Sequence, residues 1–404
     1  MGPKLFSFTK GETTYSFRLL PIGGYCAMEG EDEESDNPRA FNNAKIFKRM
    51  IIVVAGAVMN ILFGLVLMMI TLLPQQEFSS TTVASFAPYS FTAASGLQEG
   101  DEIVEINDYK INCSNDFSFA IYTLPVSEVD GTTLEIFKED CLFDLRHHCA
   151  LLAQDATDEQ IEAVYSVWEE GGKRIALSSS KEEAYALMCT YFDKISDVFD
   201  KDRVEQYPEI KEEKTRLRFR TDMTVIRNGE ETILNDVDFY SYRPDKDAEP
   251  ALAIDFIVEP IEKTFGTLLS QTGMRTVSVV RMVYNSLAGL LKGQFGINDV
   301  SGPVGLASAI TDVASESLKT GFLDAVMSIV FVMMVITINL GIVNMLPFPA
   351  LDGGRFVMLL IEAIFKKPVP RKIEGVINAV GLALLLLLMA VITFKDIWVL
   401  IFGG

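Results

Sequence analysis

Histidine is nearly absent from this chain of 404 residues, which contains only His147 and His148. The two are adjacent, so they cannot lie one helical turn apart on the same face, the spacing that a helical pair of zinc-binding histidines requires. Basic residues are also scarce, with 35 Lys and Arg against 55 Asp and Glu and a net charge of −20. Such an acidic chain is repelled by phosphate backbones, so nucleic acid is excluded from the expected partners.

Long apolar runs are present, by contrast, and three of them can cross a lipid bilayer. They cover residues 51–73, 322–346 and 375–394, each with about 20 apolar residues or more. Hydrophobic residues make up 49% of the chain, and the charged residues are concentrated outside the runs. These features predict an α-helical membrane protein with a sizeable aqueous part.

Basic residues flank the runs on two sides and predict their orientation. Lys45, Lys48 and Arg49 precede the first run. Five more lie in a loop expected at 354–374, between the second and third runs: Arg355, Lys366, Lys367, Arg371 and Lys372. Because Lys and Arg accumulate on the cytoplasmic side, both segments are expected there. Residues 75–321 would then lie outside the cytoplasm.

The second run ends in the ten residues N-M-L-P-F-P-A-L-D-G, from Asn344 to Gly353. Two prolines follow Asn344 within five residues, so the helix must unwind there. Unwound backbone at membrane depth is tolerated only beside protein or a water-filled cavity, and an ionisable residue next to it is a candidate functional residue. Asp352 is that residue. Alone, Asp-Gly-Gly is also compatible with an ordinary turn.

The spacing N-x-x-P-x-P-x-L-D-G resembles the second metal motif of the site-2 proteases, a family of intramembrane zinc metalloproteases. Other segments are similar to the bacterial regulator-of-sigma-E type: 2–6, 20–25, 56–60, 302–305 and 351–355. The resemblance implies that Asp352 is a zinc ligand and that Asn344 and Asn60 are hydrogen-bonding residues around the ligands. It further implies a location in the bacterial cytoplasmic membrane. Implied substrates are single-span membrane proteins such as anti-sigma factors or signal-peptide remnants.

The first metal motif of that family, H-E-x-x-H, is missing from the chain. Two zinc-binding histidines and the general base Glu are therefore absent, and the chain as given is expected to be inactive. Because Met1-Gly2-Pro3-Lys4 matches the interior of a family segment, we expect roughly 20 to 40 upstream residues with a fourth membrane helix. The alternative is a non-catalytic pseudoprotease or membrane adaptor. A transporter is disfavoured by three spans without an inverted repeat.

A β-hairpin is expected in the segment 1–50, with a Lys-Gly turn and alternating residues from Thr9 to Leu19. The resemblance makes this hairpin the membrane loop that approaches the active site. An extended substrate could add a strand to its edge at Thr14, Tyr15, Ser16 and Phe17. Taken alone, the pattern predicts only a surface hairpin.

The segments 74–125 and 216–260 resemble two parts of a PDZ domain placed outside the cytoplasm. Glycine turns and an alternating strand occupy 94–107, and Asn228-Gly229 predicts a hairpin. Between them, 126–215 is an acidic insertion whose helices begin at capping boxes at Thr157 and Ser180. The aromatic and aliphatic residues expected to form its core are Leu142, Phe143, Tyr165, Trp168, Tyr185, Phe192 and Phe199.

Cysteine and histidine gather in the insertion between 141 and 149, but their spacing fits no common zinc template. One disulfide bond is compatible with the outward cysteines Cys113, Cys141, Cys149 and Cys189. The segment 261–321 is expected to hold an amphipathic helix over 262–291, followed by a linker. That helix would lie on the outer membrane surface or pack against the PDZ-like domain.

Overall fold

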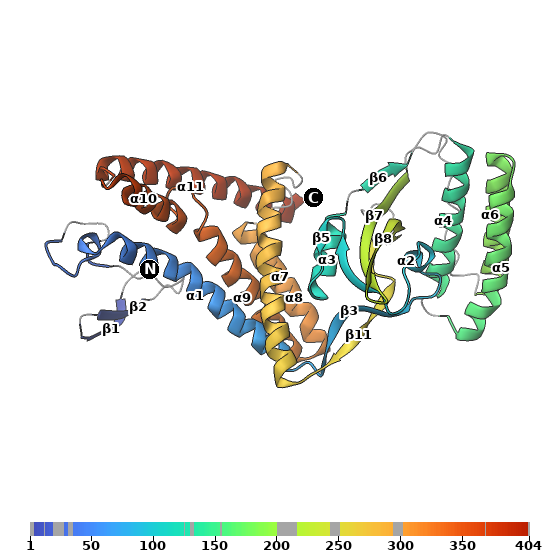
Figure 1. Ribbon diagram of the computed structural model, residues 1–404, viewed down its shortest axis with the longest axis horizontal. Helices are drawn as coiled ribbons and strands as arrows, with labels where there is room; N and C mark the ends of the chain where they lie inside the picture. The colour runs from blue at the N-terminus through green and yellow to red at the C-terminus, as the bar shows by residue number, and fades with distance from the viewer. Residues whose placement is uncertain are drawn as a thin grey trace. The chain divides into compact units, whose positions relative to one another are not determined.

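The computed structural model describes residues 4–11, 13–18, 28–30, 35–124, 126–129, 133–153, 156–199, 216–242, 251–293, 302–367 and 369–402 (Figure 1). The chain forms two compact units. One comprises Met1–Gly64 and Lys292–Gly404, and the other comprises Leu65–Leu291.

The first unit is mainly helical. Its helices are α1 (Ile46–Leu72), which continues into the second unit, α8 (Pro303–Thr320), α9 (Phe322–Asn344), α10 (Asp352–Phe365) and α11 (Arg371–Phe402). Among the described residues, three helices are long and apolar enough to cross a membrane: Ile46–Leu72, Phe322–Asn344 and Lys372–Ile401. Each of the three predicted spans is therefore a helix that can cross a membrane by its length and composition.

Two of the spans are longer than the apolar runs indicated. The first begins five residues earlier, at Ile46, and includes Arg49. The Arg49 guanidinium forms an ion pair of 2.6 Å with Glu362 of α10. This pairing offsets the cost of a charge near the membrane, so the helix continues past the end of its apolar stretch.

Two helices around the second span were not predicted. α10 begins at Asp352 and continues to Phe365, in the stretch 354–374 expected as a cytoplasmic loop, and α8 covers Pro303–Thr320, in the expected linker. α10 has an apolar face with Leu359 buried. Shorter helices of this kind escape a search for long apolar runs because their charged faces lower the average hydropathy.

Close contact between α1 and α9 depends on small residues. A methyl group added to Gly341 would lie 3.0 Å from the Ala57 carbonyl oxygen and 3.2 Å from Asn60 Cβ, and one added to Gly64 would collide with Ile338. α8 joins the same bundle through a hydrogen bond of 2.7 Å between the hydroxyls of Ser317 and Ser328. Glycine allows such close helix packing in membranes, where dispersion contacts replace the hydrophobic effect.

A separate hairpin lies near the N-terminus of the first unit. β1 (Lys4–Lys10) and β2 (Thr13–Arg18) pair antiparallel, with Phe8 opposite Tyr15 and Thr9 opposite Thr14. Gly11 in the turn has φ +66°, which glycine adopts without strain. The predicted hairpin is present.

The second unit is built on a seven-stranded sheet of order β11-β3-β4-β7-β6, with β5 paired to β4 and β8 paired to β7. The strands are β3 (Glu77–Phe86), β4 (Glu102–Ile106), β5 (Tyr109–Lys110), β6 (Val126–Val129), β7 (Arg216–Arg227), β8 (Glu230–Asp238) and β11 (Phe256–Glu262). Two short strands, β9 (Tyr240–Tyr242) and β10 (Ala251–Ala253), pair separately.

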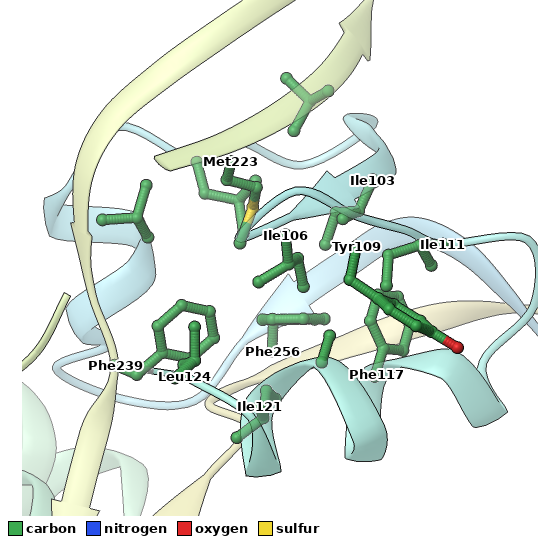
Figure 2. Packing of buried hydrophobic residues seen from close by; sticks show 14 of the residues in the cluster. Ile103, Ile106, Tyr109, Ile111, Phe117, Ile121, Leu124, Met223, Phe239 and Phe256 are labelled. Atoms are coloured by element: carbon green, nitrogen blue, oxygen red, sulfur yellow. The ribbon is translucent and has the colours of Figure 1, made fainter. Parts of the chain in front are cut away.

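The core of this sheet lies against the short helix α3 (Asn115–Tyr122), as Figure 2 shows. Ile103 and Ile106 from β4 pack with Phe117 from α3 and Phe256 from β11. The rings of Phe117 and Phe256 meet edge to face, with centroids 5.7 Å apart. The predicted strand is present, but its burial does not alternate strictly: Ile103 and Ile106, three residues apart, share one core because the register with β7 shifts between Ile103 and Glu105.

Turn chemistry in this unit follows the sequence closely. Asn228 and Gly229 both have positive φ, +53° and +83°, and connect β7 to β8. Two left-handed residues in succession are what a tight hairpin requires, so the predicted turn is confirmed. Upstream, α2 (Phe91–Ala94) is followed by Gly96 and Gly100 at positive φ before β4 begins.

Three helices of the insertion pack on one another: α4 (Leu134–Ala153), α5 (Asp158–Leu177) and α6 (Lys181–Ser196). The capping box at Thr157 forms in full with Gln160. At the start of α6 the Ser180 hydroxyl accepts from the Glu183 amide, while the Glu183 carboxylate accepts from Ser179 N instead of Ser180 N.

The core of the insertion differs in part from the predicted one. Phe192 and Phe199 are buried, and Leu142, Trp168 and Tyr185 pack against the core, whereas Tyr165 is 55% exposed and Phe143 stacks on Phe91 of α2. One further aromatic residue, Tyr191, lies in the centre. Small, aliphatic and sulfur-containing residues complete it: Cys141, Leu145, Cys149, Leu152, Val164, Ile175, Ala184, Met188 and Ile195. Aromatic content alone misleads because the α4–α6 packing also requires small side chains.

The insertion is attached to the sheet unit by polar and aromatic contacts. Arg146 of α4 donates to the Ser90 carbonyl at 2.7 Å and lies over the Trp168 ring at 4.6 Å. Tyr89 donates its hydroxyl to the Ile161 carbonyl at 2.9 Å. These contacts hold α4 and α5 against the loop before α2.

Helix α7 (Phe265–Lys292) turns its polar face inward. Five polar side chains are buried on it: Gln271, Thr272, Arg275, Thr276 and Ser278. The opposite face is apolar and exposed, with Phe265, Leu269, Val277, Tyr284 and Leu291. Among the exposed residues between Phe265 and Leu291 none is charged. We call these five exposed apolar residues the α7 stripe.

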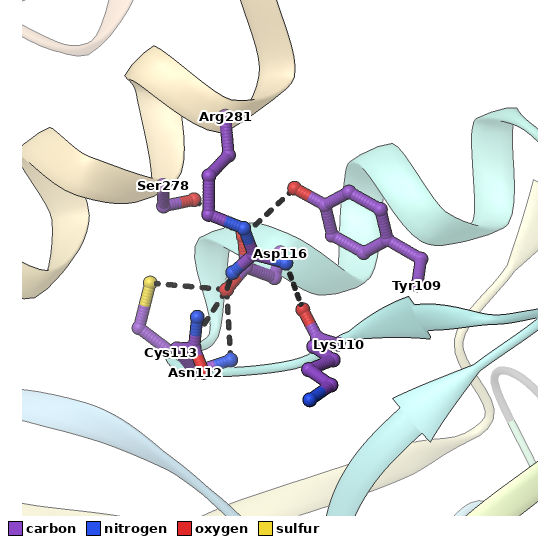
Figure 3. Close-up of polar contacts among 7 residues, drawn as sticks. All are labelled: Tyr109, Lys110, Asn112, Cys113, Asp116, Ser278 and Arg281. Carbon is purple, nitrogen blue, oxygen red and sulfur yellow. Dashed lines mark hydrogen bonds and ion pairs between the residues drawn. The ribbon is translucent and has the colours of Figure 1, made fainter. Parts of the chain in front are cut away.

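A buried carboxylate fastens α7 to the sheet unit (Figure 3). Asp116, which is fully buried at the start of α3, accepts from Ser278 Oγ at 2.6 Å, from Tyr109 Oη at 3.2 Å and from the Asn112 amide at 2.8 Å. Arg281 adds an ion pair of 3.5 Å to the same carboxylate. A buried charge with several donors is stabilised only while all of them stay in place, so α7 is held in one orientation.

Arg281 also binds the sheet unit directly. It donates to the Lys110 carbonyl at 2.6 Å and lies 4.7 Å from the centroid of the Tyr109 ring. At the start of α7, Lys263 donates to the carbonyls of Leu73, at 2.5 Å, and Gln75, at 2.9 Å. The beginning of α7 is thereby tied to the chain that leaves α1.

Candidate metal centre

Asp352 is the first residue of α10, immediately after an unwound turn. α9 ends at Asn344, and the chain turns through Met345 to Leu351 before helix resumes. Pro347 and Pro349 lack an amide N–H and fix φ, so α9 cannot continue. Ala350 has φ +71°, a left-handed conformation in the middle of this turn. The predicted interruption of the helix is therefore present.

Two glycines press the start of α10 against this turn. A Cβ at Gly353 would collide with the backbone carbonyls of Met345 and Leu346, and one at Gly354 with the Phe348 carbonyl. Asp352-Gly353-Gly354 is thus the tightly packed first turn of a helix and not an ordinary reverse turn. The packing fixes the direction from which the Asp352 side chain leaves the backbone.

Gly56 of α1 lies close to the Asp352 carboxylate. A Cβ built on Gly56 would lie 3.7 Å from Asp352 Oδ2. A methyl group at position 56 would therefore make an ordinary contact with the carboxylate, and larger side chains here would approach it more closely. The structure brings together two segments that the sequence places almost 300 residues apart, 56–60 and 351–355.

Asn60 and Asn344 lie on facing sides of the contact between α1 and α9. Asn60 is one helical turn after Gly56 and packs against Gly341. Asn344 is three residues after Gly341 and so shares its face of α9. Both asparagines are partly buried. Their predicted role in orienting metal ligands stays a prediction.

Two residues of α11 support the same turn, and sequence reasoning missed them. The Asn378 side-chain oxygen accepts from the Ala350 amide at 3.2 Å, and Gly381 lets Pro349 approach so closely that an added Cβ would lie 2.7 Å from its carbonyl oxygen. A signal was available: Asn378 is the one amide side chain in the third apolar run. Polar residues within such runs usually have a specific partner.

The β1–β2 hairpin carries the residues predicted to bind substrate. Thr14, Tyr15 and Ser16 are exposed in β2, and the Tyr15 ring stacks on Phe8 with centroids 5.0 Å apart. Phe17 lies opposite Phe6 in the register. In the part of the chain that the structure describes, this sheet contains only these two strands, so each presents an outer backbone edge.

The model of peptidase family M50 matches residues 1–388. The chain belongs to this family of site-2 proteases. The regulator of sigma-W protease RasP of Bacillus subtilis is 27% identical over 426 residues, covering 98% of this chain and 89% of the relative. The zinc metalloprotease RasP of Geobacillus kaustophilus is 28% identical, covering 98% of this chain and 88% of the relative. A protein of Clostridium acetobutylicum with a provisional zinc metalloprotease name is also 28% identical, covering 98% of this chain and 86% of the relative.

The M50 family is zinc-dependent. Carboxylate oxygen is a ligand that zinc accepts, so the chemistry of Asp352 is compatible with its predicted role as a zinc ligand. Among the described residues no group of three His, Cys, Asp or Glu could hold a metal ion. The described residues therefore form no complete metal site by themselves, and the role of Asp352 as a zinc ligand stays a prediction.

The two histidines belong to the insertion and not to this centre. His148 Nε2 makes a hydrogen bond of 2.9 Å with Ser196 Oγ, and its ring stacks on Phe192. Burial lowers the pKa of both His147 and His148 to about 4, so they are neutral at pH 7.

The cysteines follow the same pattern. No disulfide bond joins the four cysteines that the structure describes. Burial raises the pKa of the Cys113, Cys149 and Cys189 thiols, which keeps them protonated. Cys141 and Cys149 lie in the core of the insertion, Cys189 packs against that core, and Cys113 is buried beside Asp116.

Proposed function

We propose that this protein is an intramembrane zinc metalloprotease that cleaves single-span membrane proteins. The observation that carries the proposal is the position of Asp352: an ionisable residue at the unwound end of a candidate membrane span, on the first turn of α10, with Gly56 of another span beside it. A zinc ion in such a site activates water and polarises the scissile carbonyl. Asp352 would hold the ion, and Asn60 and Asn344 would orient its ligands.

We further propose that substrates are membrane-anchored regulators or signal-peptide remnants. The name of the Bacillus subtilis relative links that protein to regulation of sigma-W. An anti-sigma factor with one membrane span fits both this name and an active site at the end of membrane helices. The β1–β2 hairpin would hold the unwound substrate, because an extended peptide can pair with an exposed strand edge near Thr14 and Ser16.

The sheet unit is proposed to be a PDZ-like domain outside the cytoplasm of a bacterial cell. Lys and Arg flank α1 and the segment around α10, which favours the cytoplasm for these two regions and the outside for residues 75–321. The α7 stripe is proposed to rest on the outer surface of the membrane. An uncharged apolar face that begins beside the chain leaving α1 supports this placement.

The decisive experiment replaces Asp352 with Asn in the full gene product. The amide is a poorer zinc ligand and lacks the carboxylate charge, so we expect cleavage of a single-span substrate to fall by at least about 100-fold and zinc content to drop, with normal membrane insertion. Asp324→Asn, at an exposed position in the first turn of α9, is the matched control. Wild-type cleavage and zinc content in Asp352→Asn would refute the assignment and favour a non-catalytic adaptor.

A further inference from the structure

A second carboxylate in the helical unit has a defined partner that the proteolytic site does not explain. Asp396, near the end of α11, is 7% exposed, and its Oδ2 accepts from the amides of Gly302 at 2.9 Å and Gly305 at 2.8 Å. Lys395 lies 3.3 Å from its other oxygen. Gly302 precedes α8 and Gly305 lies in its first turn. The carboxylate therefore caps α8 from another helix.

This cap explains why the segment Gly302-Pro303-Val304-Gly305 has its composition. The first amides of a helix have no partner within the helix, and Gly302 has no side chain with which to bind them. A Cβ at Gly302 would lie 2.9 Å from Asp396 Oδ2, and one at Gly305 would lie 3.0 Å from it. Only glycine leaves room for the carboxylate at both positions. Pro303 lacks an amide N–H, so it adds no donor that needs a partner.

The opposite part of α11 touches the turn before Asp352. Asn378 accepts from the Ala350 amide, and Gly381 is packed against Pro349. Asn378 and Asp396 are 18 residues apart on one uninterrupted helix, which corresponds to about 27 Å. α11 is thus held at one point by the start of α8 and presses at another on the turn that carries the candidate metal ligand.

We propose that Asp396 is a positioning residue that clamps α11 to α8 and, through Asn378 and Gly381, holds the Pro349–Ala350 turn and Asp352 in place. The charge of Asp396 is stabilised by the amides and the positive end of the α8 dipole. Without the clamp α11 can shift, and the turn loses its support. The proposal rests on the function proposed above, since it assigns a purpose to the position of Asp352.

The first arm of the test measures hydrogen exchange in membranes for wild type, Asp396→Asn and Gly305→Ala. Both variants break the clamp, the first by removing the charge and the second by displacing the carboxylate. We expect exchange at least about tenfold faster in peptides covering 302–308 and also in those covering 345–351, with helices α4–α6 unchanged. Asp312→Asn, an exposed carboxylate on α8, is the control and should behave as wild type. Faster exchange confined to 302–308 would overturn the positioning role.

The second arm measures cleavage of a reporter with one membrane span and a short outer segment. Asp396→Asn and Asn378→Ala should each lower kcat about tenfold and leave KM within about twofold, because orientation is lost and binding is not. Residues this far apart normally act independently. If both act through α11, kcat of the double variant should be at most about threefold lower than kcat of the less active single variant. A loss of kcat of about 100-fold in the double variant, which is the product of two independent tenfold losses, would contradict the proposal.

The two arms separate this inference from the proposed protease activity. If the wild-type protein cleaves no reporter, the proposed function fails, while the exchange measurements still decide whether the clamp holds the turn. If Asp396→Asn does not accumulate in membranes, Gly305→Ala and Asn378→Ala carry both arms. Unchanged exchange at 345–351 in these variants would refute the clamp.

Discussion

At the scale of single residues, the sequence is most informative where a charged or polar side chain lies in a segment in which its burial costs free energy. Asp352 could be singled out because a carboxylate beside an apolar run needs a reason, and the two prolines before it predicted where the helix would unwind. Gly56 was noted only as part of the segment 56–60 that resembles the family. Its role depends on a contact between α1 and α10, which no local pattern contains.

A series at Gly56 tests that contact. Gly56→Ala should retain near-normal cleavage, because its Cβ would lie 3.7 Å from Asp352 Oδ2, an ordinary contact. Gly56→Val and Gly56→Leu add carbons that approach the carboxylate, so we expect losses of about tenfold or more. The measurement is reporter cleavage at matched membrane abundance.

Gly375 supplies the control for this series. A Cβ at Gly375 of α11 meets no atom within 4 Å, so Gly375→Val should leave cleavage unchanged. Equal activity of Gly56→Leu and wild type would show that the space beside Gly56 is not needed.

At the scale of elements, the long apolar helices, the hairpins and the capped helix α5 could be predicted, since each has a local signature. The helices α8 and α10 could not, because they are short and partly polar. The sequence also could not show that the polar face of α7 is the one that contacts protein. Its amphipathic pattern was visible, yet which face meets protein depends on Asp116, which lies more than 150 residues upstream.

The α7 stripe can be tested by adding charge to it. Val277→Glu places a carboxylate at the centre of the exposed apolar face, 55% exposed, where it should not disturb the polar contacts on the other side. If the stripe rests on lipid, labelling of Leu269→Cys by a lipid-soluble photoactivatable probe should fall severalfold in the Val277→Glu background.

Glu259→Gln on the exposed part of β11 is the control and should leave this labelling unchanged. Labelling of Leu269→Cys no stronger than that of a cysteine at exposed Glu99, before any charge is added, would place the stripe away from the bilayer.

At the scale of the whole molecule, the division into membrane helices, sheet unit and insertion follows from composition, but the attachment of the insertion does not. From the sequence, all of 126–215 was expected to form the insertion. The structure shows that β6, at the beginning of that block, pairs with β7 and belongs to the seven-stranded sheet. The Arg146 guanidinium binds the Ser90 carbonyl and lies over the Trp168 ring, which contacts Tyr89. These contacts attach α4 and α5 to the sheet unit.

Deletion of residues 133–199, which spares β6 and β7, should therefore leave cleavage of an already trimmed single-span substrate within about twofold of wild type. Cleavage of the untrimmed substrate should stay equal or rise if the insertion helps to exclude it. The comparison uses both substrates in membranes with equal amounts of protein. Loss of trimmed-substrate cleavage at equal abundance would show that the insertion contributes to the catalytic part of the molecule.

The pairing of β6 with β7 has a consequence for how such proteins can change over time. The chain leaves the sheet after Val129 and returns at Arg216, and these two residues are direct partners in the register. The distance between the two ends is therefore fixed by the strands, and each doubling of the intervening length costs only about 0.6 kcal/mol in loop-closure entropy. This site can accept sequences of very different size, including a fluorescent reporter domain, without altering the membrane helices.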